Sequence, residues 1–552
     1  MSTATTNGAS NGAAPKDEPV EKKEPNGTVD AGLKSLEHYK RALPRWRYRL
    51  RQRLLPIVRW ETPHLARLQR ALRTPALDYY FAWTANLGTH TFFMIMLPVL
   101  FWCGEPAYGK GIVHILATGV FFTGFIKDMF SLPRPLSPPL HRITMSGSAA
   151  LEYGFPSTHS ANAVSVAVYS LLKLREHSAA FSPSTALALE VLAYFYAVSI
   201  VFGRLYCGMH GFLDVITGSA LGALISLIEF HCAPWIEEWL QSSSYLAPLT
   251  IVLFILLFVR IHPEPADDCP CFDDSVSFAG VMIGLELGTW RFARYSPLAP
   301  VYVGTNPTFD LSALTWPVAL GRIVLGIAVI VSWREVMKPT LLKLLPHLYR
   351  VFETYGLSLP RKFFTPASKY KDVPLRGLKD DNVLPHVADV AKAVKSIRGP
   401  GRGRAVSVGP QSAADAYETL AWRERKRRES LSRERNALKS KKSVGGLQKG
   451  EQQVECRQVS GVRSGGRKEE FEQGEVVEVV SEGELELEEE EELLDEKDVF
   501  SRVVKPRVRY DVEVVTKLVV YAGIGWLSVD PILILFELIG LGTGQYPGLN
   551  LR

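Results

Sequence analysis

Long apolar runs are the feature that most constrains how this chain can fold. Several approach the roughly 20 residues that a helix needs to cross a bilayer. Lipid offers the backbone no hydrogen-bond partner, so crossing segments must be helices or closed barrels. The pattern predicts an all-α, polytopic transmembrane helical bundle. The runs lie near residues 79–103, 110–130, 159–174, 186–203, 212–231, 246–261, 276–290 and 317–333. A later stretch, 514–541, is interrupted by Asp530-Pro531 and predicts a kinked span or a re-entrant hairpin, which gives about seven to nine spans.

Charge divides the rest of the 552-residue chain. The net charge of +6 is too small to indicate nucleic-acid binding, but basic and acidic residues are strongly segregated. Low-complexity charged sequence is typical of disordered tails. We therefore expect a disordered N-terminus (1–33), a basic interfacial segment (34–77), a core segment (78–232), additional transmembrane helices (233–335), a basic juxtamembrane segment (336–394), a disordered charged tail (395–500) and a C-terminal membrane segment (501–552).

The basic segment combines charge with large apolar side chains. Residues 34–73 hold twelve Lys and Arg against two Glu, interleaved with Trp46 and Trp60 among others. This composition beside a membrane span predicts a helix that lies on anionic headgroups. The six cysteines show no metal-ligand spacing, and Cys269-Pro-Cys271 is interpreted as a structural feature or free thiols.

Three short polar clusters interrupt the core segment. In the first, Lys127 ends an apolar run and Arg134 stands between Pro133 and Pro135. A charge at membrane depth usually faces a polar cavity, although a lone Lys in this place snorkels to the interface at least as often. The prolines stiffen the loop around the Arg134 guanidinium. Arg can hold two phosphate oxygens in its planar fork, and Lys adds a point charge.

The second and third clusters add hydroxyl, imidazole and carboxylate groups. Pro156-Ser157-Thr158-His159 precedes a predicted helix, so Ser157 or Thr158 can cap it and its free N–H groups can bind an anion. Alone, this would be an ordinary cap. Arg204 and His210 lie between two apolar runs, and Asp214 follows four residues after His210. On a helix that Asp shares a face with the His and can orient it as a nucleophile, although alone it would be an ordinary surface pair.

Taken together, Lys-x6-Arg-Pro, Pro-Ser-x-His and Arg-x5-His-x3-Asp resemble the motifs of the phosphatidic acid phosphatase type 2 superfamily of metal-independent lipid phosphatases. The resemblance covers about residues 79–232, and 78–232 would be the catalytic core. Thr158 stands where many members have Gly, and Gly203 where many have Ser, which would cost one phosphate contact. The Thr form, the additional spans and the basic segment are similar to the sphingosine-1-phosphate and long-chain base phosphate phosphatases, particularly the fungal branch.

The resemblance implies a role for each polar residue. His210 would attack phosphorus and become a phosphohistidine, Asp214 would orient His210, and His159 would protonate the leaving alkoxide and then activate water. Phosphate would be bound by Lys127, Arg134, Ser157, Thr158 and Arg204. No metal or other cofactor would be needed, because fixed cations can stabilise the transferring phosphoryl group.

We therefore expect an endoplasmic-reticulum phosphatase for sphingoid long-chain base 1-phosphates. The alternatives are a phosphatase for phosphatidate, diacylglycerol pyrophosphate or a polyprenyl phosphate, and a non-catalytic membrane transporter or scaffold whose tail recruits partners.

The sequence leaves open which side of the membrane the polar clusters face. Two spans, 79–103 and 110–130, separate the basic segment from the first cluster, which puts both on one side. The positive-inside rule places that side in the cytosol, whereas the resemblance implies a lumenal site.

Overall fold

The computed structural model describes residues 36–88, 90–136, 139–143, 152–242, 244–266, 269–296, 298, 315–357, 361, 364–373 and 508–542. Within these ranges the chain is helical and has no β-strand, apart from one isolated bridge between Thr365 and Tyr510. The predicted all-α membrane bundle is therefore confirmed. The expected disordered segments, 1–33 and 395–500, lie outside the described residues.

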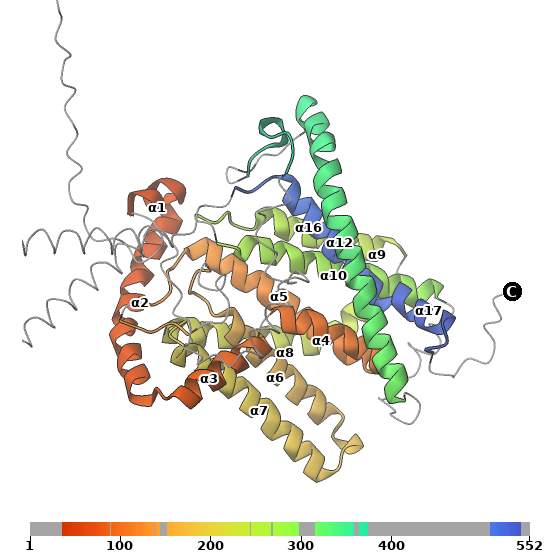
Figure 1. The fold of residues 1–552 in the computed structure, drawn as a ribbon, viewed down its shortest axis with the longest axis horizontal. Helices are drawn as coiled ribbons and strands as arrows, with labels where there is room; N and C mark the ends of the chain where they lie inside the picture. Colours follow the sequence, from red (N-terminus) through yellow and green to blue (C-terminus); the bar gives the residue numbers. More distant parts are fainter. Residues whose placement is uncertain are drawn as a thin grey trace, which may run out of the picture.

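The helices, shown in Figure 1, are α1 (Leu36–Ala42), α2 (Arg45–Leu72), α3 (Pro75–Thr84), α4 (His90–Cys103), α5 (Pro106–Phe130), α6 (Thr158–Glu176), α7 (Pro183–Tyr206), α8 (Phe212–Ser242), α9 (Leu246–Ile261), α10 (Cys271–Tyr295), α12 (Trp316–Thr354), α16 (Val512–Val529) and α17 (Pro531–Leu538). Short 3-10 turns lie at Ala85–Gly88, Ser178–Ala180 and Ala367–Lys369. By length and composition, five of the described helices can cross a membrane: α5, α7, α8, α12 and α16. The larger number of seven to nine spans stays a prediction.

Local sequence explains where several helices begin. Thr74 caps α3 and Ser182 caps α7, and each is followed by a proline in the first turn. Such a proline has no N–H to leave unsatisfied at that position, and its backbone already has the helical φ angle. Ser157 caps α6, where its Oγ accepts a hydrogen bond from the backbone N–H of Ser160. The cap that the sequence predicted at Ser157 or Thr158 is Ser157.

The most buried of the five apolar helices is α5, which packs against α6, α8 and α10. Close approach of α6 and α8 depends on two glycines spaced four apart, Gly218 and Gly222. A Cβ on either would collide with the backbone of α6, at Ser157 and Ala161 respectively. Small residues at this spacing allow membrane helices to pack backbone against backbone. The first turns of α6 and α8 are thereby held side by side.

The segment expected to be one span, 79–103, is broken into α3, a 3-10 turn and α4. The ring of Phe81 in α3 contacts Phe202 and Tyr206 at the C-terminal end of α7. At the far end of α4, Trp102 donates a hydrogen bond from Nε1 to the carbonyl oxygen of Ser528, 3.0 Å away. The segment therefore extends from the C-terminal end of α7 to the C-terminal end of α16, and its crossing as one span stays a prediction.

The described C-terminal segment is part of the bundle interior rather than an addition to its edge. Helix α16 packs against α10 on one side and α12 on the other (Figure 1). Gly284 of α10 leaves no room for a Cβ against the backbone of Ala522. The predicted interruption lies at Asp530, where α16 ends and α17 begins; this side chain is fully buried and pairs with Arg291. Helix α12 continues through residue 335, the expected segment boundary.

The basic segment is docked on the bundle. One face of α2 crosses the ends of α5 and α8, as Figure 1 shows. Arg51 is fully buried and donates from Nε to the carbonyl oxygen of Ser131, just past the end of α5, at 3.0 Å. Glu61 accepts the backbone N–H of Leu213, in the first turn of α8, at 2.9 Å. The helix therefore supports the loops at this end of the bundle.

The opposite face of α2 is open. Trp46 is 59% exposed and Trp60 is 65% exposed, and several of the arginines between them are exposed as well. This face has the aromatic and basic composition that predicts a helix lying on a membrane surface. Burial of the other face was not predicted from the sequence.

Candidate active site

Four helix ends meet beneath α2 and bring the three polar clusters together. They are the C-terminal ends of α5 and α7 and the N-terminal ends of α6 and α8. The backbone N–H of Ser157, before α6, donates to the carbonyl oxygen of Asp214 in α8 at 3.0 Å. Arg134, after α5, reaches the ring of His210, between α7 and α8. The structure therefore gathers residues that are separated by most of the core segment.

The first cluster follows the end of α5. Lys127 lies in the last turn, and Ser131 ends the helix with a left-handed backbone conformation, φ 51°. Both Lys127 and Arg134 are buried. Arg134 donates from Nη1 to the carbonyl oxygen of Met209 at 2.8 Å. A long, flexible side chain is thus fixed at several points before any ligand binds, which lowers the entropy cost of binding.

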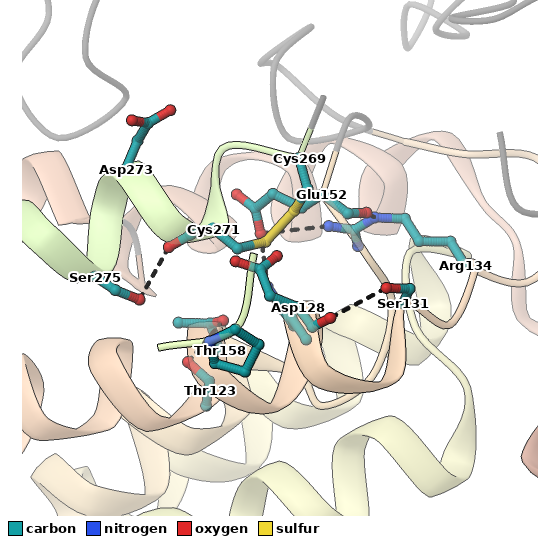
Figure 2. The surroundings of a disulfide bond; sticks show 12 residues. Thr123, Asp128, Ser131, Arg134, Glu152, Thr158, Cys269, Cys271, Asp273 and Ser275 are labelled. Atoms are coloured by element: carbon teal, nitrogen blue, oxygen red, sulfur yellow. Dashed lines mark hydrogen bonds and ion pairs between the residues drawn. A yellow bond between two sulfur atoms is a disulfide. The ribbon is translucent and has the colours of Figure 1, made fainter. Parts of the chain in front are cut away.

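The second cluster provides the start of α6. Ser157 and Thr158 are buried, and the Thr158 hydroxyl donates to Thr123 of α5 at 3.1 Å (Figure 2). That contact turns the Thr158 side chain toward α5 and leaves its backbone N–H in the first turn of the helix. The N-terminus of a helix attracts anions through its free N–H groups and its dipole. His159 is half-buried in the same turn.

His210 lies in the loop before α8 and is almost fully buried. Its Nδ1 is 2.9 Å from the carbonyl oxygen of Gly154, and its Nε2 is 3.0 Å from Nη1 of Arg134. A carbonyl only accepts and a guanidinium only donates, so the hydrogen-bond network assigns the proton to Nδ1 and the lone pair to Nε2. The ring therefore presents its lone pair on the side of the cations, where it accepts a hydrogen bond from Arg134.

Asp214 stands behind His210, in the first turn of α8. Its Oδ2 is 3.6 Å from Nδ1 of His210, beyond hydrogen-bond distance, and accepts the backbone N–H of Gly211 at 2.8 Å. His210 precedes the helix, so the two side chains do not share a helical face as the spacing suggested. Asp214 lies next to the ring, while the Gly154 carbonyl makes the direct hydrogen bond.

Arg204 is the least satisfied of the three clustered cations. It lies in the last turn of α7 and is 4% exposed. Within the described part of the chain, its Nε has no hydrogen-bond partner. An unsatisfied buried donor is costly, so the guanidinium is a favourable binding group for an anion. The preceding residue, Gly203, faces away: a Cβ there would be 2.9 Å from the ring of Phe81. A side chain at 203 would contact α3 rather than a phosphate.

The cations control the protonation of His210. Burial lowers the pKa of His210 well below its ordinary value, and the charges of Arg134, Arg204 and Lys127 lower it further, with a contribution from His159. Burial also lowers the pKa of Arg134 to about 10, where Glu152 opposes the shift. His210 is therefore neutral and nucleophilic at pH 7, whereas Arg134 stays charged.

Sequence reasoning missed two residues in the loop before α6. Glu152 contacts Lys127 and Arg134, the two cations of the first cluster. Gly154 supplies the carbonyl that holds His210, and a Cβ on it would be 2.8 Å from the carbonyl oxygen of Pro133. Their proximity to the second cluster, five and three residues before Ser157, was the signal that could have identified them. Backbone contacts of this kind leave no residue pattern.

The described residues contain one group with metal-ligand geometry, next to this site. It consists of Asp128, Cys269 and Cys271 (Figure 2). The two cysteines are bonded to each other as a disulfide, which removes the thiolates that would bind a metal and leaves one carboxylate. The structure thus decides between the two interpretations of Cys269-Pro-Cys271 in favour of a structural feature. The disulfide packs against Tyr153, between Glu152 and Gly154.

Comparison with known proteins points to one family. The model of the PAP2 superfamily matches residues 110–238. A dihydrosphingosine 1-phosphate phosphatase of Schizosaccharomyces pombe is 40% identical over 328 residues, which covers 59% of this chain and 78% of that protein. A second one, of Saccharomyces cerevisiae, is 33% identical over 312 residues, covering 56% and 75%. Sphingosine-1-phosphate phosphatase 2 of Mus musculus is 25% identical over 304 residues, covering 52% and 83%. No solved structure matches the chain.

Proposed function

Since this chain belongs to the PAP2 superfamily, we propose that it is a membrane phosphatase that removes phosphate from sphingoid long-chain base 1-phosphates through a phosphohistidine intermediate. It is a multi-pass membrane protein and a phosphoric monoester hydrolase acting on lipid phosphates. The substrate class is supported by relatives named as dihydrosphingosine 1-phosphate and sphingosine-1-phosphate phosphatases.

The observation that carries the mechanism is the pairing of an unprotonated imidazole nitrogen with buried cations. Nε2 of His210 has its lone pair on the side of Arg134, and Arg204 has an unsatisfied donor nearby in the same cluster of helix ends. A phosphate bound by these guanidinium groups is presented to the nucleophile. Holding both reactants in place supplies much of the rate enhancement of a phosphoryl transfer.

In the first half of the reaction, Nε2 of His210 attacks phosphorus. A nitrogen–phosphorus bond forms and the bond between phosphorus and the ester oxygen breaks. His159, as imidazolium, gives its proton to the departing alkoxide, so the sphingoid base leaves as an alcohol. The Gly154 carbonyl and the Asp214 carboxylate stabilise the positive charge that develops on the His210 ring.

In the second half, water attacks the phosphohistidine. Neutral His159 takes a proton from this water, the nitrogen–phosphorus bond breaks, and His210 returns to its neutral state as inorganic phosphate leaves. Lys127, Arg134 and Arg204 offset the charge on the phosphoryl oxygens in both transition states, together with the Ser157 hydroxyl and the backbone N–H of Thr158. These fixed cations provide the electrostatic stabilisation that other phosphatases obtain from metal ions.

The same proposal includes the cellular setting. We place the protein in the endoplasmic reticulum membrane, with the catalytic end of the bundle toward the lumen. Direct contacts put α2 and the site on one face of the bundle, so the two share a compartment. The lumenal assignment follows the family resemblance and departs from the positive-inside rule, which sets topology only on average.

A panel assay tests the function. Purified protein in detergent–lipid micelles is incubated with dihydrosphingosine 1-phosphate, sphingosine 1-phosphate, phosphatidate, diacylglycerol pyrophosphate and a polyprenyl phosphate, and released phosphate is measured. We expect the highest kcat/KM for the sphingoid phosphates, with no release by the His210→Ala variant. Preference for phosphatidate would overturn the substrate assignment, and no release from any lipid would overturn the enzymatic one.

A further inference from the structure

Glu152 places a carboxylate on the cations that are proposed to bind phosphate. Its Oε2 is 2.7 Å from Nζ of Lys127 and 3.6 Å from Nη2 of Arg134. Its backbone carbonyl oxygen also accepts a hydrogen bond from Nε of Arg134 at 2.9 Å. Figure 2 shows Glu152 beside the disulfide and turned toward the Arg134 guanidinium. The carboxylate therefore lies at the edge of the proposed phosphate site.

This position is unfavourable for binding phosphate alone. A carboxylate next to Lys127 and Arg134 competes with the phosphate for both cations and repels it. Like charges placed together in a site of low dielectric cost several times more than in water. A site that recognised only a phosphate and an apolar tail would bind better with a neutral residue here. The carboxylate is therefore expected to have a positively charged partner in the bound state.

A sphingoid base 1-phosphate carries such a group. Its ammonium is on the carbon next to the one that bears the phosphate ester, so it must lie beside the phosphate wherever the phosphate binds. Phosphatidate and polyprenyl phosphates have no amine at this place. When phosphate oxygens take over Lys127 and Arg134, the released Glu152 carboxylate is adjacent to the ammonium, and each charge again has a partner.

The surrounding structure fixes the backbone of Glu152, and part of its side chain is exposed. The next residue, Tyr153, is buried against Cys269 and Cys271, and Gly154 packs against the backbone of Arg134. The Glu152 side chain itself keeps 13% of its surface exposed, more than Lys127 at 2% or Arg134 at 4%. Of these three side chains, Glu152 is therefore the most accessible to a bound ligand.

We propose that Glu152 is a specificity-determining residue that binds the ammonium group of the sphingoid base. The inference rests on the proposed function and adds the feature that separates amine-bearing lipid phosphates from the others. In the free enzyme Glu152 is held by Lys127 and Arg134. In the complex it exchanges these partners for the substrate ammonium.

Two substrates that differ only around the amine test this role. They are dihydrosphingosine 1-phosphate and octadecyl phosphate, which has an apolar chain and a phosphate monoester but no amine. For Glu152→Gln we expect kcat/KM to fall about 10- to 100-fold on dihydrosphingosine 1-phosphate, the loss typical of one hydrogen bond between charged groups. On octadecyl phosphate it should stay the same or rise, because the competing charge is gone. Glu152→Asp should keep part of the preference for the amine.

The matched control is Glu176→Gln. Glu176 also pairs with a lysine, Lys173, at 2.8 Å, but lies exposed at the far end of α6. The Glu176→Gln substitution should leave kcat/KM unchanged on both lipids. Activity on octadecyl phosphate shows that Glu152→Gln is folded. If Glu152→Gln loses all activity and its melting temperature falls, the role is tested with Glu152→Asp instead, because this variant retains the charge.

The outcomes separate the inference from the proposed function. An equal loss on both lipids would mean that Glu152 only positions Lys127, and no loss on either would mean that it has no role; both overturn the inference and leave the phosphatase intact. Wild-type protein that hydrolyses octadecyl phosphate as well as dihydrosphingosine 1-phosphate would also overturn it. Wild-type protein inactive on both lipids would overturn the proposed function.

Discussion

Nδ1 of His210 lies 2.9 Å from the carbonyl oxygen of Gly154, and this contact fixes Nε2 as the ring nitrogen that carries the lone pair. The carboxylate of Asp214 is farther away, with Oδ2 3.6 Å from the same nitrogen. A backbone carbonyl therefore takes the orienting position that a carboxylate holds in the serine protease triad. Asp214 instead accepts a hydrogen bond from the backbone N–H of Gly211, at the start of α8.

The first prediction concerns the nucleophile and the general acid. His210→Ala should lower kcat at least about 1,000-fold, because it removes the atom that attacks phosphorus. His159→Ala should lower it about 100-fold or more, the usual contribution of a positioned acid. The measurement is phosphate release by purified protein, with expression level and membrane insertion checked alongside. Near-normal turnover by His210→Ala would show that the nucleophile is another group.

The same series includes Asp214→Asn. An amide keeps an oxygen that can accept the Gly211 N–H, and the Gly154 carbonyl still holds the ring. What is lost is a negative charge beside a developing imidazolium, so kcat should fall by about 10- to 100-fold, less than for His210→Ala. A loss as large as that of His210→Ala would mean that Asp214 closes the remaining distance during the reaction.

The second prediction concerns Gly154. A Cβ at this position would be 2.8 Å from the carbonyl oxygen of Pro133 and 3.0 Å from Cα of Arg134, both backbone atoms. In Gly154→Ala the two loops must separate, which moves the carbonyl that holds His210 relative to Arg134. A displacement near 1 Å costs about 100-fold in rate. Kinetics and a melting curve check this together; unchanged kcat in a stable variant would contradict the role of the contact.

The third prediction concerns pH. Burial and the neighbouring cations lower the pKa of His210 in the free enzyme. The neutral form of His210 therefore persists below pH 6.5. In a plot of kcat/KM against pH, the fall at acid pH that is due to protonation of His210 should lie at lower pH than for an ordinary histidine. Lys127→Met removes one of these cations, so the pKa of His210 should rise and this acid limb of the plot should move to higher pH.

The comparison is made between wild type and Lys127→Met on the same lipid, because ionisation of the substrate phosphate contributes equally to both profiles. Lys173→Met, which changes a half-buried lysine near the other end of α6, is the control and should leave the limb in place. A shift of the Lys127→Met limb to lower pH would contradict the electrostatic assignment.

The fourth prediction concerns metal ions. Charge stabilisation is assigned to Lys127, Arg134 and Arg204, so phosphate release should be unchanged after incubation with excess EDTA. Replacement of Arg204 by Met should reduce kcat/KM about 100-fold and should not be rescued by added Mg²⁺. Activity that disappears on chelation and returns with Mg²⁺ would place the protein in a different class of phosphatase.

The fifth prediction concerns sidedness. Pro139, in the loop after the first cluster, and Ser178, in the turn between α6 and α7, are both exposed and lie at opposite ends of α6. In a variant without other free cysteines, each is replaced by Cys and probed with an impermeant thiol reagent on sealed microsomes whose cytosolic face is outside. With a lumenal site, Ser178→Cys reacts directly and Pro139→Cys reacts only after detergent. The reverse pattern would place the site in the cytosol, as the charge rule predicts.

Much of the fold and the site could be predicted from the sequence because their signals are local. Apolar run length determines that a segment crosses lipid as a helix, and the cap at Ser157 follows from the hydroxyl before the helix. The three polar clusters are visible because charged and polar groups are costly inside apolar sequence. Lys127, Arg204 and His210 stand out for this reason, and the structure brings their clusters to the same end of the bundle.

The sequence by itself therefore determined the class of fold, the polar residues at the helix ends and the chemistry to which they belong. Tertiary structure decided that α2 is docked over the site, that α16 lies within the bundle, and that Gly154 rather than Asp214 makes the direct bond to His210. It also placed Glu152 on Lys127. Membrane helices are apolar on nearly every face, so periodicity does not show which faces meet. The contacts that arrange this site join backbone atoms and segments distant in the chain, and such contacts leave no pattern in the local sequence.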